Sequence, residues 1–344
     1  MTAGSSRAWL LPAVIVGLLL VFAVPSMTRN EYFLALGVSF AIFSVLSGGL
    51  NLVYGYTGLL SFAQVGFFGL GAYTATLLVT ELDWSLWPGA LAGGLLAAVA
   101  GLGIGYSSLR LSRHAFAIVT LSFALLCMIL ARDWVSLTRG SMGIPGLPIP
   151  SLILPGGIAW RLNSPADFYY LLMGFAVVSQ AIIYAVVHSR LGRALRAIKL
   201  NEPLAQSQGI NPLAYKLLAI TLSAFLTGVG GAFFVFYLTI ADPSLFDFYY
   251  TETMLIMVII GGPGSFWGVL FATAVLTVLP DLLRFTTDLR LVLYGLILIA
   301  AMLVFPGGVG GWFARRRLLR WRNRPYGELP GQTAGAVPDK EAAQ

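Results

Sequence analysis

The long polar stretch between the apolar segments of this chain reads His188-Ser-Arg-Leu-Gly-Arg-Ala-Leu-Arg-Ala-Ile-Lys-Leu-Asn-Glu-Pro-Leu-Ala-Gln-Ser-Gln-Gly-Ile-Asn-Pro-Leu-Ala-Tyr-Lys216. It contains five of the 21 basic residues and a single acid. The pattern predicts two short helices, and the first runs from Arg190 to Leu200. Its basic residues are spaced three apart and form a slowly turning stripe: Arg190, Arg193, Arg196 and Lys199.

The second predicted helix covers Glu202–Gly209 and has its own start and stop signals. Asn201 or Glu202 can cap its amino end, and Pro203 suits the first turn, where no amide donor is needed. Gly209 suits the left-handed position that follows a helix. Two interpretations of the whole stretch stay open: a basic loop held by lipid head groups, or a docking element for a partner protein on the cytoplasmic face.

The composition is that of a membrane protein. Hydrophobic residues make up 58% of the chain and charged residues 10%, whereas soluble domains carry about 25% charged residues. The predicted fold class is therefore an all-α membrane protein, a polytopic helical bundle. The net charge of +7 does not imply nucleic acid, because the basic residues cluster in loops, as the positive-inside rule predicts.

The sequence lacks the residues that several classes of protein need for their function. The two histidines, His114 and His188, lie at the edges of apolar segments, so a metal site or histidine catalysis has little to use. No lysine follows the glycine-rich pattern of an ATP-binding loop. No charged residue lies within the first seven apolar segments, which argues against a proton- or sodium-driven pump. The chain is expected not to be an enzyme and to bind no metal or cofactor itself.

Hydropathy predicts the membrane-spanning segments. The first, Trp9–Val24, could also be a signal peptide, but no small-residue cleavage site is obvious before Pro25. The next six are Tyr32–Tyr54, Leu59–Thr80, Pro88–Leu109, Ala115–Ala131, Phe168–Val187 and Leu217–Ile240. Thr251–Leu279 is longer than one span requires and is interrupted by glycines, and Leu291–Phe305 closes the bundle.

Charge counting favours a break within Thr251–Leu279. With a break, 15 basic residues lie inside and 6 outside, whereas a single span would split them 10 to 11. The prediction is about ten transmembrane segments with both termini cytoplasmic. Residues 1–8 form a cytoplasmic amino terminus, 9–313 the membrane domain with its cytoplasmic loop 188–216, and 314–344 a basic and then disordered tail.

Four stretches, in order along the chain, resemble the branched-chain amino acid permeases of the LivM type, which belong to the ABC transporters. Gly55-Tyr-Thr-Gly-Leu-Leu-Ser-Phe-Ala-Gln-Val-Gly-Phe-Phe-Gly-Leu-Gly-Ala-Tyr73 is similar to a signature of that family, and Leu191–Asn211 looks like its cytoplasmic coupling segment. Thr138–Gly146 and Gly261–Gly268 are similar to further family stretches. The likeness covers about residues 32–312.

The resemblance implies a permease subunit of an ATP-driven importer in the bacterial inner membrane. Its expected partners are a second homologous permease, two cytoplasmic ATPases that bind the ATP, a periplasmic binding protein and membrane lipid. The implied substrates are branched-chain or other hydrophobic amino acids; urea, short amides or aromatic acids are the alternative, and a secondary transporter is a more distant one. The residues expected to couple to the ATPase are Arg193, Arg196, Glu202, Pro203, Ala205 and Gly209.

Polar and glycine positions inside the spans are candidates for the substrate path. They are Ser61, Gln64, Tyr73, Gly261, Gly262 and Gly264. For the polar residues a second interpretation is open, namely hydrogen bonding between helices, because polar groups in hydrocarbon usually bond a neighbouring helix. Gly66, Gly69 and Gly71 are expected to serve close helix packing. A helix break at membrane depth often borders a cavity, which is the argument for Gly261–Ser265.

Overall fold

The structure is a computed structural model that describes residues 30–148, 150–153, 159–162 and 164–282. It also describes the single residues Gly295, Ile299, Gly308, Gly310 and Gly311. The predicted first segment, the predicted tail and all of the closing segment except Gly295 and Ile299 lie outside the described residues.

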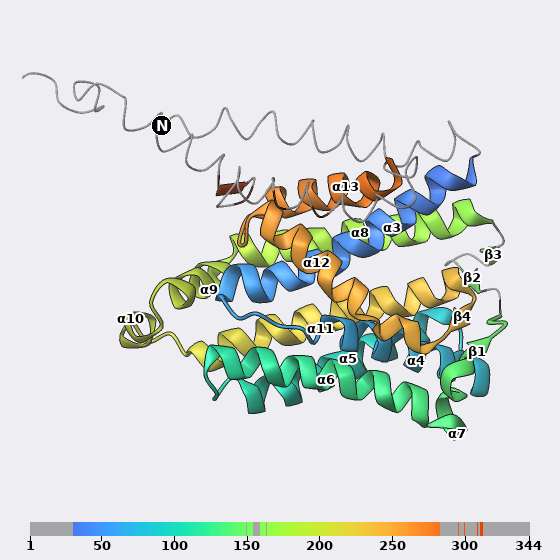
Figure 1. Cartoon of the computed structure of the whole chain (residues 1–344), viewed down its shortest axis with the longest axis horizontal. Helices are drawn as coiled ribbons and strands as arrows, with labels where there is room; N and C mark the ends of the chain where they lie inside the picture. The colour runs from blue at the N-terminus through green and yellow to red at the C-terminus, as the bar shows by residue number, and fades with distance from the viewer. Residues whose placement is uncertain are drawn as a thin grey trace, which may run out of the picture.

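Long helices run side by side along the longest axis of the molecule (Figure 1). They are α3 (Glu31–Leu50), α4 (Gln64–Glu81), α5 (Leu86–Ser108), α6 (Arg113–Asp133), α8 (Pro165–His188), α11 (Pro212–Leu238), α12 (Phe248–Gly261) and α13 (Phe266–Leu282). A π-helix, η1 (Asn51–Gly55), continues α3. The short helices α9 (Arg190–Leu200) and α10 (Glu202–Ser207) lie at one end of the bundle, called here the α9–α10 end.

The opposite end carries short strands and turns (Figure 1). β1 (Ile144–Pro145) pairs antiparallel with β4 (Ile240–Ala241), and β2 (Ser151–Ile153) pairs antiparallel with β3 (Ala159–Arg161). The remaining short elements are α7 (Val135–Thr138) and the 3-10 helices η2 (Gly140–Met142) and η3 (Pro243–Phe246). The β1–β4 pair joins the connection between α6 and α8 to the chain that follows α11.

Six helical stretches within the described residues are long and apolar enough to cross a membrane. They are Glu31–Gly55, Leu86–Ser108, Arg113–Asp133, Pro165–His188, Pro212–Leu238 and Pro243–Gly261. The predicted fold class, an all-α polytopic membrane protein, is therefore confirmed. The sequence placed five of these spans within a few residues of their observed bounds.

Glycines bring α11 into close contact with α4 and α5. A Cβ atom on Gly71 of α4 would overlap the backbone carbonyl of Gly228 in α11, and one on Gly93 of α5 would lie 2.5 Å from the carbonyl oxygen of Gly71. Gly231 of α11 faces the carbonyl of Phe68 in the same way. Small residues let helix backbones approach without intervening side chains, so the packing role predicted for Gly71 is confirmed. Gly66 and Gly69 instead make room for aromatic rings, those of Phe123 and Phe246.

The third predicted span, Leu59–Thr80, is wrong at its start, because the helix begins only at Gln64. Residues 58–63 are not helical, and Gly58 has a φ of 78°. Side chains take the place of helical carbonyls there: the amide of Leu59 donates to Thr57 Oγ1 at 3.3 Å, and that of Phe62 to Thr120 Oγ1 at 3.1 Å. Hydroxyl groups can satisfy a backbone that leaves the helix, provided that the segment is buried in protein.

The predicted break in Thr251–Leu279 is present. α12 ends at Gly261, α13 begins at Phe266, and a turn connects them. Gly262 and Gly264 have φ values of 93° and 90°, a region that glycine enters without steric cost. The turn, residues 262–265, is called here the α12–α13 corner.

Candidate functional site

Helix α9 packs against α8, α11 and η1 at one end of the bundle. Ser189 caps it, with its Oγ accepting from the amide of Leu191 at 3.1 Å. The buried face consists of Gly192, Ala194, Leu195 and Ile198. Leu195 belongs to a buried cluster whose other members come from η1 and the residue after it, from α8 and from α11: Leu52, Tyr56, Ile183, Val187, Ala219 and Leu226. The bounds predicted from the sequence, Arg190 to Leu200, are confirmed.

Helix α10 is short and is closed at both ends. Asn201 is the cap, because its Oδ1 accepts from the amide of Leu204 at 3.1 Å. At the other end Gly209 has a φ of 79°. The amide of Gly209 donates to Gln206 O at 2.9 Å and that of Ile210 to Ala205 O at 3.1 Å, the paired bonds of a Schellman motif. The predicted signals are confirmed, with Asn201 rather than Glu202 as the cap.

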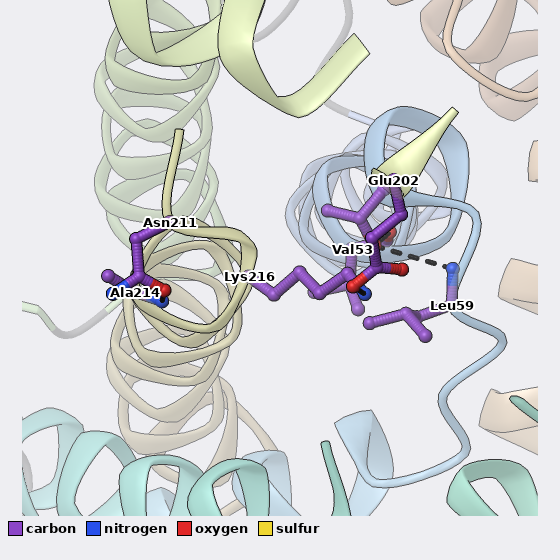
Figure 2. A network of polar contacts seen from close by, with 7 residues as sticks. Val53, Leu59, Glu202, Asn211, Ala214 and Lys216 are labelled. Atoms are coloured by element: carbon purple, nitrogen blue, oxygen red, sulfur yellow. Dashed lines mark hydrogen bonds and ion pairs between the residues drawn. The ribbon is translucent and has the colours of Figure 1, made fainter. Parts of the chain in front are cut away.

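An ion pair fastens α10 to α11. Lys216 points from the first turns of α11 toward Glu202 at the start of α10 (Figure 2), and Lys216 Nζ lies 2.6 Å from Glu202 Oε1. The Lys216 side chain is only 8% exposed and that of Glu202 33%. A cavity of about 260 Å³ opens beside the pair, and Arg110 of the turn between α5 and α6 also lines it. Sequence reasoning placed Glu202 in the site but missed both basic residues.

The predicted basic stripe is divided by the structure. Arg193 is exposed. Arg196 donates from Nη2 to the carbonyl of Val187 at 2.8 Å, and its guanidinium lies 5.6 Å from the centre of the Tyr56 ring. Lys199 turns inward, and its burial lowers the pKa of its ammonium group. The stripe is therefore not one uniform surface for lipid or for a partner.

The candidate path residues have separate partners. Gln64 is fully buried: its Nε2 donates to Ser223 Oγ at 2.6 Å, and its Oε1 accepts from Thr227 Oγ1 at 3.1 Å. Both partners lie on α11, so Gln64 joins two helices. Ser61 is 3% exposed, and its Oγ accepts from the amide of Ala63 at 3.4 Å.

Tyr73 and the three candidate glycines do not share the hydrogen-bond partners of Gln64 and Ser61. The Tyr73 ring stacks on Phe246 with 5.8 Å between centroids, and its buried hydroxyl has no hydrogen-bond partner within the described residues. Gly261 ends α12, and Gly262 and Gly264 form the α12–α13 corner. A role for these six residues in the substrate path stays a prediction.

These features define a class: a polytopic helical membrane protein with a short, capped helical element fastened to the ends of its spans. No group of three or more histidine, cysteine, aspartate or glutamate residues that could hold a metal occurs in the part of the chain that the structure describes. The chain belongs to the family described as the permease component of the branched-chain amino acid transport system, whose model matches residues 32–302.

Individual relatives agree with the family match. The chain is 32% identical to the high-affinity branched-chain amino acid transport system permease protein LivM of Escherichia coli (strain K12), over 78% of this chain and 67% of that protein. It is 25% identical to the corresponding LivH protein of Salmonella typhimurium, over 80% of this chain and 92% of that protein. No solved structure matches the chain.

Proposed function

We propose that this chain is the permease subunit of an ATP-driven importer that moves branched-chain or other hydrophobic amino acids across the bacterial inner membrane. The family match and the LivM relatives support the transport class and the substrate class. The observation that carries the mechanism is the construction of α10. A short rod, capped at both ends and tied to α11 by Glu202 and Lys216, can pass a displacement to the bundle as a rigid body.

The remaining subunits follow from the same family. Because the relatives include both LivM and LivH, two permease proteins of branched-chain transport, we infer a second homologous permease as the partner within the membrane. Two cytoplasmic ATPases bind and hydrolyse ATP, and their contact is α10 with the exposed residues around it. A periplasmic binding protein delivers the substrate. This chain contributes no ATP site and no catalytic residue.

The proposed topology has about ten spans, with the α9–α10 end and both termini in the cytoplasm. The described glycines near the end of the last segment support it. A Cβ atom on Gly308 would overlap Gly262, and one on Gly310 would overlap the side chain of Ser265, so both residues lie against the α12–α13 corner. A reporter enzyme fused after Arg324 is expected to be active in the cytoplasm. Activity confined to the periplasm would contradict the proposed topology.

Transport by the reconstituted complex tests the function. The chain, its partner permease and the two ATPases are purified together and placed in proteoliposomes with the binding protein and ATP. We expect ATP-dependent uptake of labelled leucine that exceeds uptake of urea, acetamide or benzoate by at least tenfold. A preference for one of the other three compounds would instead indicate urea, short amides or aromatic acids as the substrate class. Uptake by this chain alone, driven by a proton gradient, would refute the importer.

A further inference from the structure

The Lys199 side chain of α9 turns toward the bundle and contacts two other parts of the chain. Its Nζ donates to the carbonyl oxygen of Gly55 at 2.6 Å, and the carbonyl oxygen of Pro263 lies at 3.5 Å. Its stem passes Gly58, where a Cβ atom would lie 3.4 Å from Lys199 Cγ. One lysine side chain therefore contacts the end of η1, the start of the non-helical residues 58–63 and the α12–α13 corner.

Both carbonyl groups are suited to a cation. Gly55 is the last residue of η1, and the last carbonyls of a helix lack amide partners within the helix. The negative end of the helix dipole lies there as well, which favours a positive charge. Pro263 stands between two glycines of positive φ, in a turn rather than in a helix. Lys199 thus binds backbone carbonyl groups at two places where a helix ends: the end of η1, before the non-helical residues 58–63, and the α12–α13 corner.

The corner and η1 are also joined directly to each other. Asn51 Oδ1 accepts from the amide of Gly264 at 2.9 Å, and Asn51 Nδ2 donates to the carbonyl of Ser265 at 3.3 Å. A Cβ atom on Gly55 would lie 2.5 Å from the amide nitrogen of Gly264. π-Helical turns such as η1 occur often at functional sites. A force applied to Lys199 therefore acts on η1 and on the corner together.

Two links leave the α9–α10 unit in different directions. The pair Glu202–Lys216 leads to α11, and Lys199, three residues before α10 begins, leads to η1 and the corner. We propose that Lys199 is a positioning residue that transmits the displacement of α9 and α10 to the α12–α13 corner and to residues 58–63. This inference rests on the proposed function, since it assumes that an ATPase moves α10. In this arrangement the two non-helical breaks move when the ATPases close.

The test replaces Lys199 in the complete transporter, reconstituted with its partner permease, ATPases and binding protein. Lys199→Met keeps the stem beside Gly58 and removes the donor. We expect assembly and ATP hydrolysis to continue while leucine uptake falls at least tenfold, so that ATP hydrolysed per leucine rises by the same factor. Lys199→Arg retains a charged donor and is expected to restore much of the coupling. Arg190→Met is the matched control, because it removes the same charge from an exposed position of the same helix.

The outcomes separate the inference from the proposed function. A normal ratio of ATP to leucine in Lys199→Met would overturn the role of Lys199. Loss of assembly in Lys199→Met, or failure of Lys199→Arg to improve on it, would reduce Lys199 to a structural contact and would also overturn the inference. Absence of ATP-dependent uptake by the unmodified complex would instead contradict the proposed function.

Discussion

Replacing Gly71 by alanine is expected to destabilise the bundle by about 3 kcal/mol, near the upper end of the cost of overpacking a core. The added methyl group would overlap the carbonyl of Gly228, and a backbone cannot change its rotamer to avoid the contact. Helices α4 and α11 would have to separate, and the contact of α5 with both would loosen. The expected loss of roughly 5–10 °C in the thermal midpoint is measured on the purified chain in detergent.

Gly103→Ala is the matched control for Gly71→Ala. Gly103 is exposed on α5, and a Cβ atom there would meet nothing within 4 Å. Alanine favours the helix over glycine by up to about 1 kcal/mol, so this variant should be as stable as the unmodified chain or slightly more stable. Gly231→Ala, which faces the carbonyl of Phe68, should behave like Gly71→Ala. Equal midpoints for Gly71→Ala and Gly103→Ala would show that the helices do not meet at these glycines.

Replacing Glu202 by glutamine is expected to release α10 from α11. The change leaves Lys216, which is 8% exposed, without its carboxylate. Breaking a buried ion pair costs ~3–5 kcal/mol, and about 2 kcal/mol is expected here because Glu202 keeps a third of its side chain in solvent. That energy corresponds to a roughly 30-fold rise in the local opening of α10. Hydrogen exchange of the peptide that contains Ala205 and Gly209 measures it, and ATP-driven uptake should fall in parallel.

The double variant Glu202→Gln with Lys216→Met provides the control. Methionine keeps the length of the lysine stem and removes the buried charge, and replacing a whole buried pair is often neutral. Exchange in the double variant should return most of the way to that of the unmodified chain. If the single variant exchanges no faster than the unmodified chain, or the double variant stays as fast as the single one, the ion pair does not hold α10.

Local signals were sufficient for much of the fold and for part of the site. The bounds of α9, the cap at Asn201, the positive φ at Gly209 and the break after Gly261 depend on residues that lie within one or two turns of each other. Glycine, proline and asparagine impose these conformations through their own backbone and side chains. Such features can be predicted from a single sequence.

The role of Lys199 depended on distant partners. Gly55 and Pro263 are 144 and 64 residues away along the chain, and no local pattern marks them. The three-residue spacing did carry a partial signal. At about 100° per residue, the nine positions from Arg190 to Lys199 turn by about 180° net, so the two ends of the stripe face opposite sides of α9. The helical geometry already argued against one shared surface.

The non-helical residues 58–63 were missed because hydropathy does not report backbone conformation. The stretch contains Leu59, Leu60 and Phe62, which are as apolar as the residues of the helix that follows. Its hydropathy therefore predicted that it was part of a span. The signal that could have shown the break was the presence of hydroxyl side chains that accept hydrogen bonds from backbone amides in place of helical carbonyls. Thr57 lies next to Gly58, but Thr120, the acceptor for Phe62, lies on another helix and could not be assigned without the fold.

The close contact of α11 with α4 and α5 has a consequence for the order in which the protein is made. α5 ends at Ser108 and α11 begins at Pro212, so roughly 100 residues are synthesised between them. At about 5–20 residues per second, that interval lasts on the order of ten seconds. During it, α4 and α5 are already in the membrane while their glycine faces lack the helix that covers them. The late arrival of α11 makes it the element that converts inserted spans into a packed bundle.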